Sequence, residues 1–479
     1  MPNLMSTLIS SATALSVFER ALVVTENNVA NASTPGYAVQ RLALQAMDFE
    51  PELGLIGGVR AGDVESARDQ YAELAVRRQL ESLGLYDQKA ASLASLESVF
   101  SIGGDTSLPG ALSRLYDSFS AWSLTPNSGA ARQAVLDRAQ EFTESFHQAA
   151  ASLASVSSDM DRQLRETADR INSLGEQLLS YNHERRRGGI DDAGLDAKIQ
   201  VALEELSELV DFTAVFQADG SVTVLLGGQS PLVIGEELHP IHVSFFDPAD
   251  PPPIYTGTPP SARLITDDGK DITAQIAGGR LSGILDVRNR VLPSLRGDAY
   301  QPGGLNLLAK AVADRINALL TSGNITDGPP PVAGLPLFTY DASSDAMVAR
   351  SLAVNPAIAP DQLAAIDPGP PYSSNGIARK LAALANSQDE ADRIDGFSFT
   401  EYYGRLAAGV GRALEDARGG RDFKTQMVAQ ARSLRSEISG VSLDEEAVHL
   451  IEFERAYQAT ARLVSVLDEL TETTVNLLR

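Results

Sequence analysis

The chain has 479 residues and a formal net charge of −24, and 43% of its residues are hydrophobic. This length predicts about two to four domains, and the hydrophobic content is too high for a chain that is disordered throughout. The negative charge argues against nucleic acid as a partner, because a phosphate backbone would repel it. The absence of cysteine rules out disulfides and thiolate metal sites, and it suits a chain that must unfold for export.

Membrane and secretion signals are weak in this sequence. We find no uninterrupted run of about eighteen apolar residues, so we expect no segment to span a membrane. Residues 1–11 contain neither a basic region nor a compact apolar region. We therefore expect no cleavable secretory signal, and any export must use another route. The densest basic cluster, Arg185–Arg187, is expected at the solvated end of a helix.

The first predicted element is a long helix over residues 4–32. Its apolar residues recur every seven positions, with further seam positions between them, as in a coiled coil. The helix is expected to stop at Pro35 and Gly36, because this pair fits the two central positions of a type II turn. Thr34 precedes proline and therefore favours an extended backbone. The seam residues are Leu8, Leu15, Phe18, Leu22, Thr25 and Val29.

Residues 440–479 predict a second helix of the same kind. Ser442 and Glu445 are spaced as a capping box, at the helix end where acidic residues are favoured by the dipole. The apolar stripe is narrow and includes polar residues such as Glu446, so the helix should be marginal until another helix covers it. That partner is either the N-terminal helix or a neighbouring copy. The apolar residues expected to take part in assembly are Leu443, Leu450, Phe453, Tyr457, Val464, Leu467 and Leu478.

The middle of the chain is mostly helical by pattern. Residues 142–181 have the apolar spacing of a long bundle helix, and a shorter helix is expected over 195–210. Two more helices are expected over 399–417 and 423–438. These helices in the middle of the chain predict a helical bundle.

The apolar period changes from that of a helix to that of a strand at Asp211. Residues 212–217 and 222–226, joined by Asp219 and Gly220, predict a β-hairpin. We therefore expect a β-rich segment that ends near Arg280. Its further strands are expected over 232–234, 241–246, 262–266 and 272–276.

Together these elements predict a mainly α chain with an inserted β-rich domain, that is, an α+β multidomain protein. The organisation is nested, because the two chain ends pair and the next layer is built from both halves of the sequence. The expected domains are 1–62 with 440–479 as a terminal coiled coil, 63–210 with 281–439 as a helical bundle that includes a loop-rich excursion over 321–374, and 211–280 as the insertion.

Residues suited to catalysis or cofactor binding do not form a recognisable pattern. The five histidines are scattered, and His239 and His242 have no carboxylate at metal-ligand spacing. Paired glycines lack the strand-to-helix context of a phosphate-binding loop. Residues 267–271 are acidic but lack the terminal glutamate of an EF-hand loop. We therefore expect no enzyme activity, no cofactor and no metal site.

Three segments resemble one group of known proteins. Residues 27–37, which read NNVANASTPGY, resemble the segment that closes the first helix in flagellar rod, hook and hook-associated proteins. The stretches 439–447 and 450–459 are similar to the closing signature of the hook-associated protein 1 family. Residues 283–288 are similar to that family as well. The resemblance covers both ends of the chain and the flanks of the predicted insertion.

The resemblance implies a structural protein of the bacterial flagellum. Members of this family self-assemble as a ring at the hook–filament junction, between the hook protein and the next junction protein on the filament side. It also implies type III export through the flagellum, with a cytoplasmic chaperone holding the C-terminal helix before secretion. The turn residues that carry the resemblance are Asn31, Thr34, Pro35, Gly36 and Tyr37.

Two alternatives stay open at this point. The first is another axial protein, a hook or distal rod subunit, for which the lead-in at Ser439–Glu446 is the discriminating feature. The second is a secreted enzyme carried on a flagellar scaffold. An enzyme of this kind would need clustered carboxylates or histidines within residues 211–280, and the order of residues in the sequence offers none.

Overall fold

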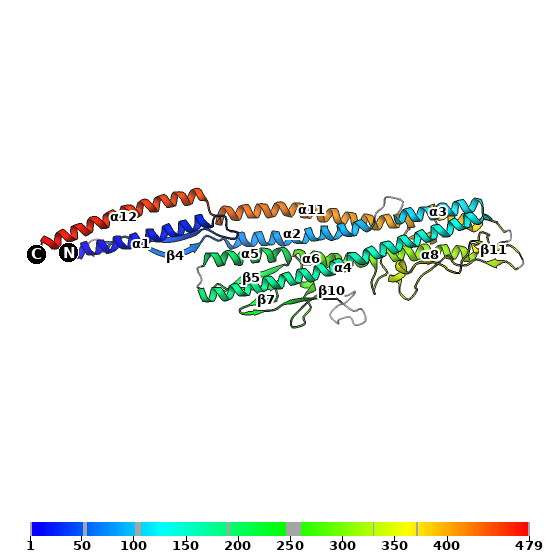
Figure 1. The fold of residues 1–479 in the computed structure, drawn as a ribbon, viewed down its shortest axis with the longest axis horizontal. Coiled ribbons are helices and arrows are strands. Elements are labelled where there is room, and N and C mark those ends of the chain that lie inside the picture. Colours follow the sequence, from blue (N-terminus) through cyan, green and yellow to red (C-terminus); the bar gives the residue numbers. More distant parts are fainter. Residues whose placement is uncertain are drawn as a thin grey trace. The chain divides into compact units, whose positions relative to one another are not determined.

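The computed structural model is mainly helical with short antiparallel strands (Figure 1), which confirms the predicted fold class. The chain divides into two compact units. Unit 1 comprises Met1–Leu83, Ile171–Pro240 and Phe423–Arg479, and unit 2 comprises Gly84–Arg170 and Ile241–Asp422. The structure describes residues 2–50, 55–100, 107–188, 192–245, 260–328, 330–369 and 372–477.

Three long helices contribute residues to both units: α2 (Gln70–Glu97), α4 (Gly129–Gly188) and α11 (Phe399–Ser439). The expected helix over 142–181 is confirmed but is longer at both ends, because residues 130–187 contain no proline and only one glycine, Gly175. The apolar spacing places its large side chains on a fully buried face. Residues of that face include Phe142, Phe146, Leu153, Leu164, Ile171, Leu174 and Leu178.

The two helices expected over 399–417 and 423–438 are one helix, α11. The pair Gly419 and Gly420 lies between the two expected ranges, inside the continuous helix. A Cβ on Gly420 would come within 2.4 Å of the ring of Tyr86. Close packing of α2 against α11 therefore accounts for glycine at this position, and the helix continues through it.

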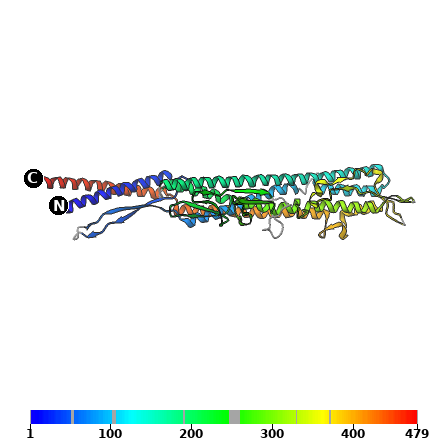
Figure 2. The same ribbon diagram turned by 90° about the horizontal axis from the view of Figure 1, so that it is seen from below.

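In unit 1 the first helix, α1 (Pro2–Asn31), lies beside the last helix, α12 (Leu443–Leu477) (Figures 1 and 2). The connection after α1 forms an antiparallel hairpin of β1 (Gln40–Ala46) and β4 (Val59–Ser66). Its register runs from Gln40 opposite Ser66 to Ala46 opposite Val59, with an irregularity between Leu42 and Leu44. Two-residue strands β2 (Phe49–Glu50) and β3 (Leu55–Ile56) extend it.

Unit 1 also contains a four-stranded antiparallel sheet in the order β5-β6-β7-β8, whose first two strands form the predicted hairpin. The sheet packs against the end of α4, where Asn182 donates to Val222 O at 2.9 Å and accepts from Val222 N at 2.8 Å. Gly175 of α4 leaves room for the side chains of Leu232 and Leu238. The strands are β5 (Phe212–Phe216), β6 (Val222–Leu226), β7 (Ser230–Ile234) and β8 (Glu237–Leu238).

The basic cluster at the end of α4 is only partly solvated, which corrects the expectation from the sequence. The side chain of Arg185 is 7% exposed and forms an ion pair with Asp196 at 3.3 Å. Asp196 lies in the first turn of α5 (Ala193–Leu209). Arg186 bonds to Asp219 and Glu236 at 3.0 and 2.8 Å. The arginines thus join the helix end to α5 and to the sheet turns.

The core of unit 2 is aromatic. Phe142 and Phe146 of α4 contact each other edge to face at 5.0 Å between ring centroids, and Phe142 lies 5.7 Å from the ring of Phe338. Phe119 and Trp122 of α3 (Leu108–Leu124) are fully buried. The other elements of unit 2 with four or more residues are β9 (Ile241–Phe245), β10 (Ala262–Thr266), α6 (Gly279–Asp286), α7 (Leu292–Arg296), α8 (Gly304–Ser322), α9 (Val348–Ser351) and α10 (Gly376–Ala383), with a π-helical turn over Val287–Val291.

The expected strand over 272–276 is wrong. Thr273–Gln275 form a 3-10 turn, because Asp271 accepts hydrogen bonds from the backbone N–H and the hydroxyl of Thr273 at 2.9 and 2.7 Å. Strands β9 and β10 pair with each other in unit 2, whereas β5–β8 belong to unit 1. The three-domain division of the sequence stays a prediction. The remaining short strands are β11 (Asn324–Thr326), β12 (Val332–Ala333), β13 (Phe338–Thr339), β14 (Ala353–Val354), β15 (Arg393–Ile394) and β16 (Phe397–Ser398).

By length and composition, Leu4–Asn31 of α1 is apolar enough to cross a membrane. This differs from the expectation that no segment qualifies, which considered only uninterrupted apolar runs. Serines and threonines are spread through α1, and few charges interrupt it. The same composition suits a helix covered by protein, and α1 packs against α12 and the β1/β4 hairpin.

The carboxyl group of Glu81 on α2 provides a test of packing in unit 1. Burial, and then the charge of Asp211, raise the pKa of Glu81 to about 7 from its usual 4.5, and Arg78 opposes the shift. Between these pH values the folded chain binds more protons than the unfolded chain, so stability falls as the pH rises.

We expect Glu81→Gln to stabilise unit 1 by roughly 1 kcal/mol at pH 8, a value discounted for solvent screening, and to have little effect at pH 4. Amide hydrogen exchange in residues 70–83 at both pH values measures the difference. An equal effect at pH 4 and pH 8 would contradict this assignment.

Candidate functional site

The paired terminal helices are the candidate site. Most predicted seam residues of α12 are half-buried, and Glu446 is 6% exposed. Leu443 is 56% exposed because it lies in the first turn, before the contact with α1 begins. Leu478 lies outside the described residues. The half-buried members are Leu450, Phe453, Tyr457, Val464 and Leu467.

The buried stripe of α1 is displaced by one position from the predicted heptad. The predicted residues Leu8, Leu15, Phe18 and Leu22 are only half-buried, and Val29 is 40% exposed. The pattern included Thr25 but missed Val17, Ala21 and Asn28, because it followed the large apolar side chains at seven-residue spacing. The buried residues of α1 are Val17, Ala21, Thr25 and Asn28.

The five turn residues of the predicted motif lie together directly after α1. Thr34 N donates to Asn31 O at 2.9 Å, and Tyr37 N donates to Thr34 O at 3.2 Å. Gly36 has a φ of +73°, as the third position of a type II turn requires. Pro35 fills the position before it. A Cβ on Gly36 would lie 2.6 Å from Ala197 O, so the turn packs closely against α5.

Asn28 is the centre of a buried hydrogen-bond network. Its side-chain nitrogen donates to Gln40 O at 2.9 Å and to Glu446 Oε2 at 3.0 Å. Its side-chain oxygen accepts from Gln40 N at 2.9 Å and from the Tyr37 hydroxyl at 3.0 Å. Burial, and then the charge of Glu446, raise the pKa of Tyr37. One asparagine therefore joins α1, the motif turn, β1 and α12.

Ser439, at the end of α11, holds the base of the hairpin. Its carbonyl accepts from Val39 N at 3.0 Å. Its hydroxyl donates to Ala67 O at 3.0 Å and accepts from Asp69 N at 3.1 Å. The chain then turns into α12, where Ser442 Oγ accepts from Glu445 N at 3.4 Å. The N-terminal cap predicted for this helix is thereby formed.

A chain of alternating charges surrounds this base. Arg68, 10% exposed, bonds to Asp196 at 2.7 Å and also pairs with Glu73. Arg435 of α11 bonds to Glu73 at 3.0 Å and pairs with Glu204 of α5. Arg68 also donates to Gly36 O at 2.6 Å. Because each charge has an opposite partner, the network fixes the motif turn relative to α2, α5 and α11.

The predicted site residues did not include Asn28, Glu446, Ser439 or Arg68. Asn28 and Glu446 could have been recognised from the sequence, since a polar residue at a seam position often fixes the register of paired helices. No sequence pattern identifies Arg68 and Ser439, because their partners are distant in sequence. Their roles depend on tertiary contacts.

Both terminal helices also carry a second apolar stripe that the pair itself does not cover. At the helical repeat, the stripe of α12 extends from the side opposite the seam to one flank of it. Its side chains are between 48% and 54% exposed. We call this set the outer stripe: Val448, Ile451, Leu463, Val466 and Leu470. On α1, Met5, Ile9 and Val23 are 58% to 61% exposed.

Within the described residues, no group of three or more His, Cys, Asp or Glu side chains could hold a metal ion.

Two family models match the chain. The model of the C-terminal region of the flagellar basal body rod FlgEFG proteins matches residues 432–477. The model of the helical domain of flagellar hook-associated protein FlgK matches residues 93–338, more than half of the chain. The chain belongs to the FlgK family. This confirms the resemblance to hook-associated protein 1 and gives the chain a structural role at the flagellar hook–filament junction.

Individual relatives agree with FlgK membership. The chain is 28% identical to flagellar hook-associated protein 1 of Bacillus subtilis strain 168, over 97% of this chain and 96% of the relative. It is 25% identical to flagellar hook-associated protein 1 of Salmonella typhimurium strain LT2, over 68% of this chain and 58% of the relative. The solved flagellar hook junction protein FlgK from Burkholderia pseudomallei has a similar fold. That match has a TM-score of 0.62 at 14% identity and covers 76% of this chain and all of the solved chain.

Gly36→Ala tests the close packing of the motif turn in this FlgK-family chain. The substitution adds strain at a positive φ and a clash with the backbone of α5. We expect it to destabilise unit 1 by about 3 kcal/mol. Gly235→Ala is the matched control, because Gly235 has a φ of +59° but open space around its Cβ position, and should cost only about 1 kcal/mol. Amide exchange in α1 and α5 measures both; equal losses would refute close packing at Gly36.

Asn28→Ala and Glu446→Ala test the buried contact between the chain ends. Each should speed amide exchange in both α1 and α12, because the partner left behind is buried and unpaired. In a double-mutant cycle we expect a coupling energy of about 1 kcal/mol. Glu469→Ala, exposed on the same helix, is the control. Strictly additive effects of the two substitutions would argue against the contact.

Proposed function

We propose that the α1–α12 pair is the joint through which copies of this chain assemble into a ring between hook and filament. The observation that carries the proposal is the two-sided apolar character of α12. Its inner seam packs against α1, whereas the outer stripe remains in water. An exposed stripe along a terminal helix is the kind of surface that marks a protein interface.

The energetics favour assembly over an isolated pair. Fully burying an apolar side chain contributes on the order of 1.5 to 3 kcal/mol. Covering the outer stripe would therefore contribute several times this free energy per copy, from which the entropy cost of ordering the helices must be subtracted. Among the residues of α1 whose side chains are described, only four are buried, and two of them, Thr25 and Asn28, are polar. The terminal pair should therefore gain most of its stability when neighbouring copies cover it.

Partners and location follow from the same surfaces. The ring would contact the hook protein on one side and the next junction protein on the filament side. Before assembly, an exposed apolar helix is an aggregation hazard, so we propose that a cytoplasmic chaperone covers α12. The absence of cysteine supports passage of an unfolded chain through the type III channel, followed by secretion to the flagellum.

A mechanical, non-enzymatic role is part of this proposal. The second candidate is a hook or distal rod subunit, and the match of residues 432–477 to the rod-protein C-terminal model is compatible with it. The longer match of residues 93–338 to the FlgK helical domain favours the junction. A secreted enzyme on a flagellar scaffold has no specific observation in its favour.

Val466→Asp places a charge on the outer stripe, where Val466 is 54% exposed. We expect the isolated chain to fold normally, since water already reaches this position, and incorporation into flagella to fall at least tenfold, since burying an unpaired charge is costly. Ser465→Asp, on the neighbouring exposed position, adds the same charge in place of a polar side chain instead of an apolar one, and should assemble.

Leu15→Asp and Leu450→Asp, within the α1–α12 contact, should also abolish incorporation but should loosen both helices in the free chain. Circular dichroism reports folding, and electron microscopy of a complemented deletion strain reports filament attachment. Normal attachment by Val466→Asp would refute the proposed joint.

A further inference from the structure

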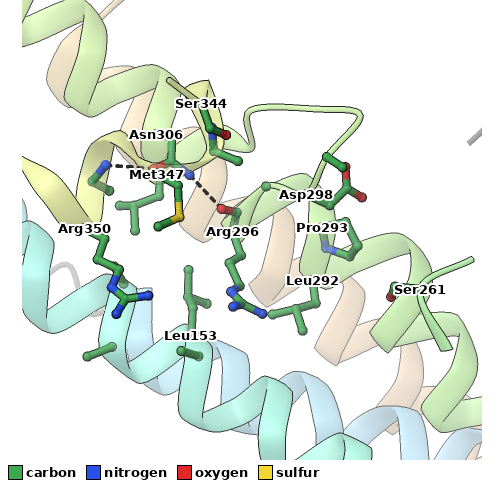
Figure 3. A pocket seen from close by; sticks show the side chains of 18 of the residues that line it. Leu153, Ser261, Leu292, Pro293, Arg296, Asp298, Asn306, Ser344, Met347 and Arg350 are labelled. Atoms are coloured by element: carbon green, nitrogen blue, oxygen red, sulfur yellow. Dashed lines mark hydrogen bonds between the residues drawn. The ribbon is translucent and has the colours of Figure 1, made fainter. Parts of the chain in front are cut away.

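Unit 2 contains a cavity of about 810 Å³ that the junction role does not use. One wall is α4 near Leu153, and the opposite side is formed by α7 with its following loop and by the segment Ser344–Arg350 (Figure 3). This volume falls in the range of sites that hold small organic molecules. The cavity is separate from the terminal helices, which belong to unit 1.

Three arginines line the cavity, and two of them lack an acidic partner. Arg288 is 11% exposed and pairs with Asp161 at 2.7 Å. Arg296 donates to Ser157 Oγ at 3.2 Å. Among the described residues, neither Arg296 nor Arg350 forms an ion pair. Figure 3 shows both of these side chains reaching into the cavity toward Leu153.

The electrostatic environment of Arg296 disfavours its own charge. Partial burial, and then repulsion by Arg288 and Arg350, lower the pKa of Arg296, and Asp161 only partly offsets them. In a chain with a net charge of −24, this is a local excess of positive charge. A bound anion would relieve the repulsion and could accept hydrogen bonds from the guanidinium groups of Arg296 and Arg350.

The backbone that carries these two arginines is fixed in place. Asn306, 3% exposed, donates to Arg296 O at 2.7 Å and to Pro302 O at 2.8 Å, and accepts from Ala349 N at 2.8 Å. The buried side chain of Asn306 thus fixes the backbone of Arg296 and that of Ala349, the residue before Arg350. The loop between is tight, since a Cβ on Gly297 would lie 2.2 Å from Pro302 O.

The remaining lining is largely apolar. Leu153, Leu292 and Pro293 form a floor beside the arginines, and Met347 lies near the opening at 39% exposure. Among the described lining residues the carboxylate is Asp298, whose Oδ1 accepts from the backbone N–H of Tyr300 and Gln301 at 2.8 and 3.0 Å. These bonds hold Oδ1 within the loop, and Oδ2 lies 3.5 Å from Gln301 Nε2.

We propose that this cavity binds a small amphipathic organic anion, an apolar body that carries a carboxylate, sulfonate or phosphate group. The head group lies between Arg296 and Arg350, and the body packs on Leu153, Leu292 and Met347. Binding here is independent of ring assembly and adds a small-molecule site to a structural chain.

Naphthalene-2-sulfonate is a suitable probe, and 2-naphthalenemethanol is its neutral counterpart. Isothermal titration of the full chain should show saturable one-site binding of the sulfonate that weakens as salt is raised, because salt screens the charge interaction. The neutral compound should bind at least tenfold more weakly.

The double variant Arg296→Gln with Arg350→Gln should weaken sulfonate binding at least tenfold. Arg162→Gln, an exposed arginine of α4 outside the cavity, is the matched control and should bind as the unmodified chain does. Met347→Asp, at the opening, should also weaken binding and serves if the double variant does not fold. Equal binding of both probes, no saturable binding of the sulfonate, or unchanged binding by the arginine and Met347 variants would overturn the proposal.

Discussion

The hydrogen bond between Asn28 and Glu446, at 3.0 Å, is the constraint on which the arrangement of the chain ends depends. These two residues are buried, whereas the large apolar seam residues of α12 are only half-buried. A slip of α1 along α12 would leave an amide and a carboxylate unpaired away from water, which costs more than the loss of a few methyl contacts. The pair therefore selects one register, as single buried polar residues do in coiled coils.

The rest of unit 1 supports that register. Ser439 and Arg68 fix the base of the hairpin and the turn after α1, so that Asn28 faces Glu446 when the last helix begins. Beyond this base, α1 and α12 bury only part of each other's apolar surface. In the proposed joint, the contact between the helices is well ordered near this base and becomes more stable along the helices as copies are added. This suits a structural member of the FlgK family at the hook–filament junction.

The sequence predicted the helices best where one face is continuously apolar. The long helix α4 and the seam of α12 follow from spacing alone, and the turn at Pro35 and Gly36 follows from the two residue types. The spacing did not predict the buried residues of α1. Ala21 and Asn28 are not large apolar residues, and their burial comes from contacts with two partners at once. The unbroken helix at Gly420 depends on Tyr86, which is distant in sequence. The cavity with Arg296 and Arg350 could not be predicted from the sequence either, since its walls come from separate parts of the chain.

Mutual dependence of the two chain ends can be measured directly in the full-length chain. Ala456→Pro should interrupt α12, because proline removes a helical hydrogen bond and clashes with the preceding turn. Hydrogen–deuterium exchange should then accelerate in residues 4–31 as well as in α12, while residues 107–170 and 260–328 keep their original rates. Unchanged exchange in residues 4–31 would show that α1 is held without α12 and would contradict the account.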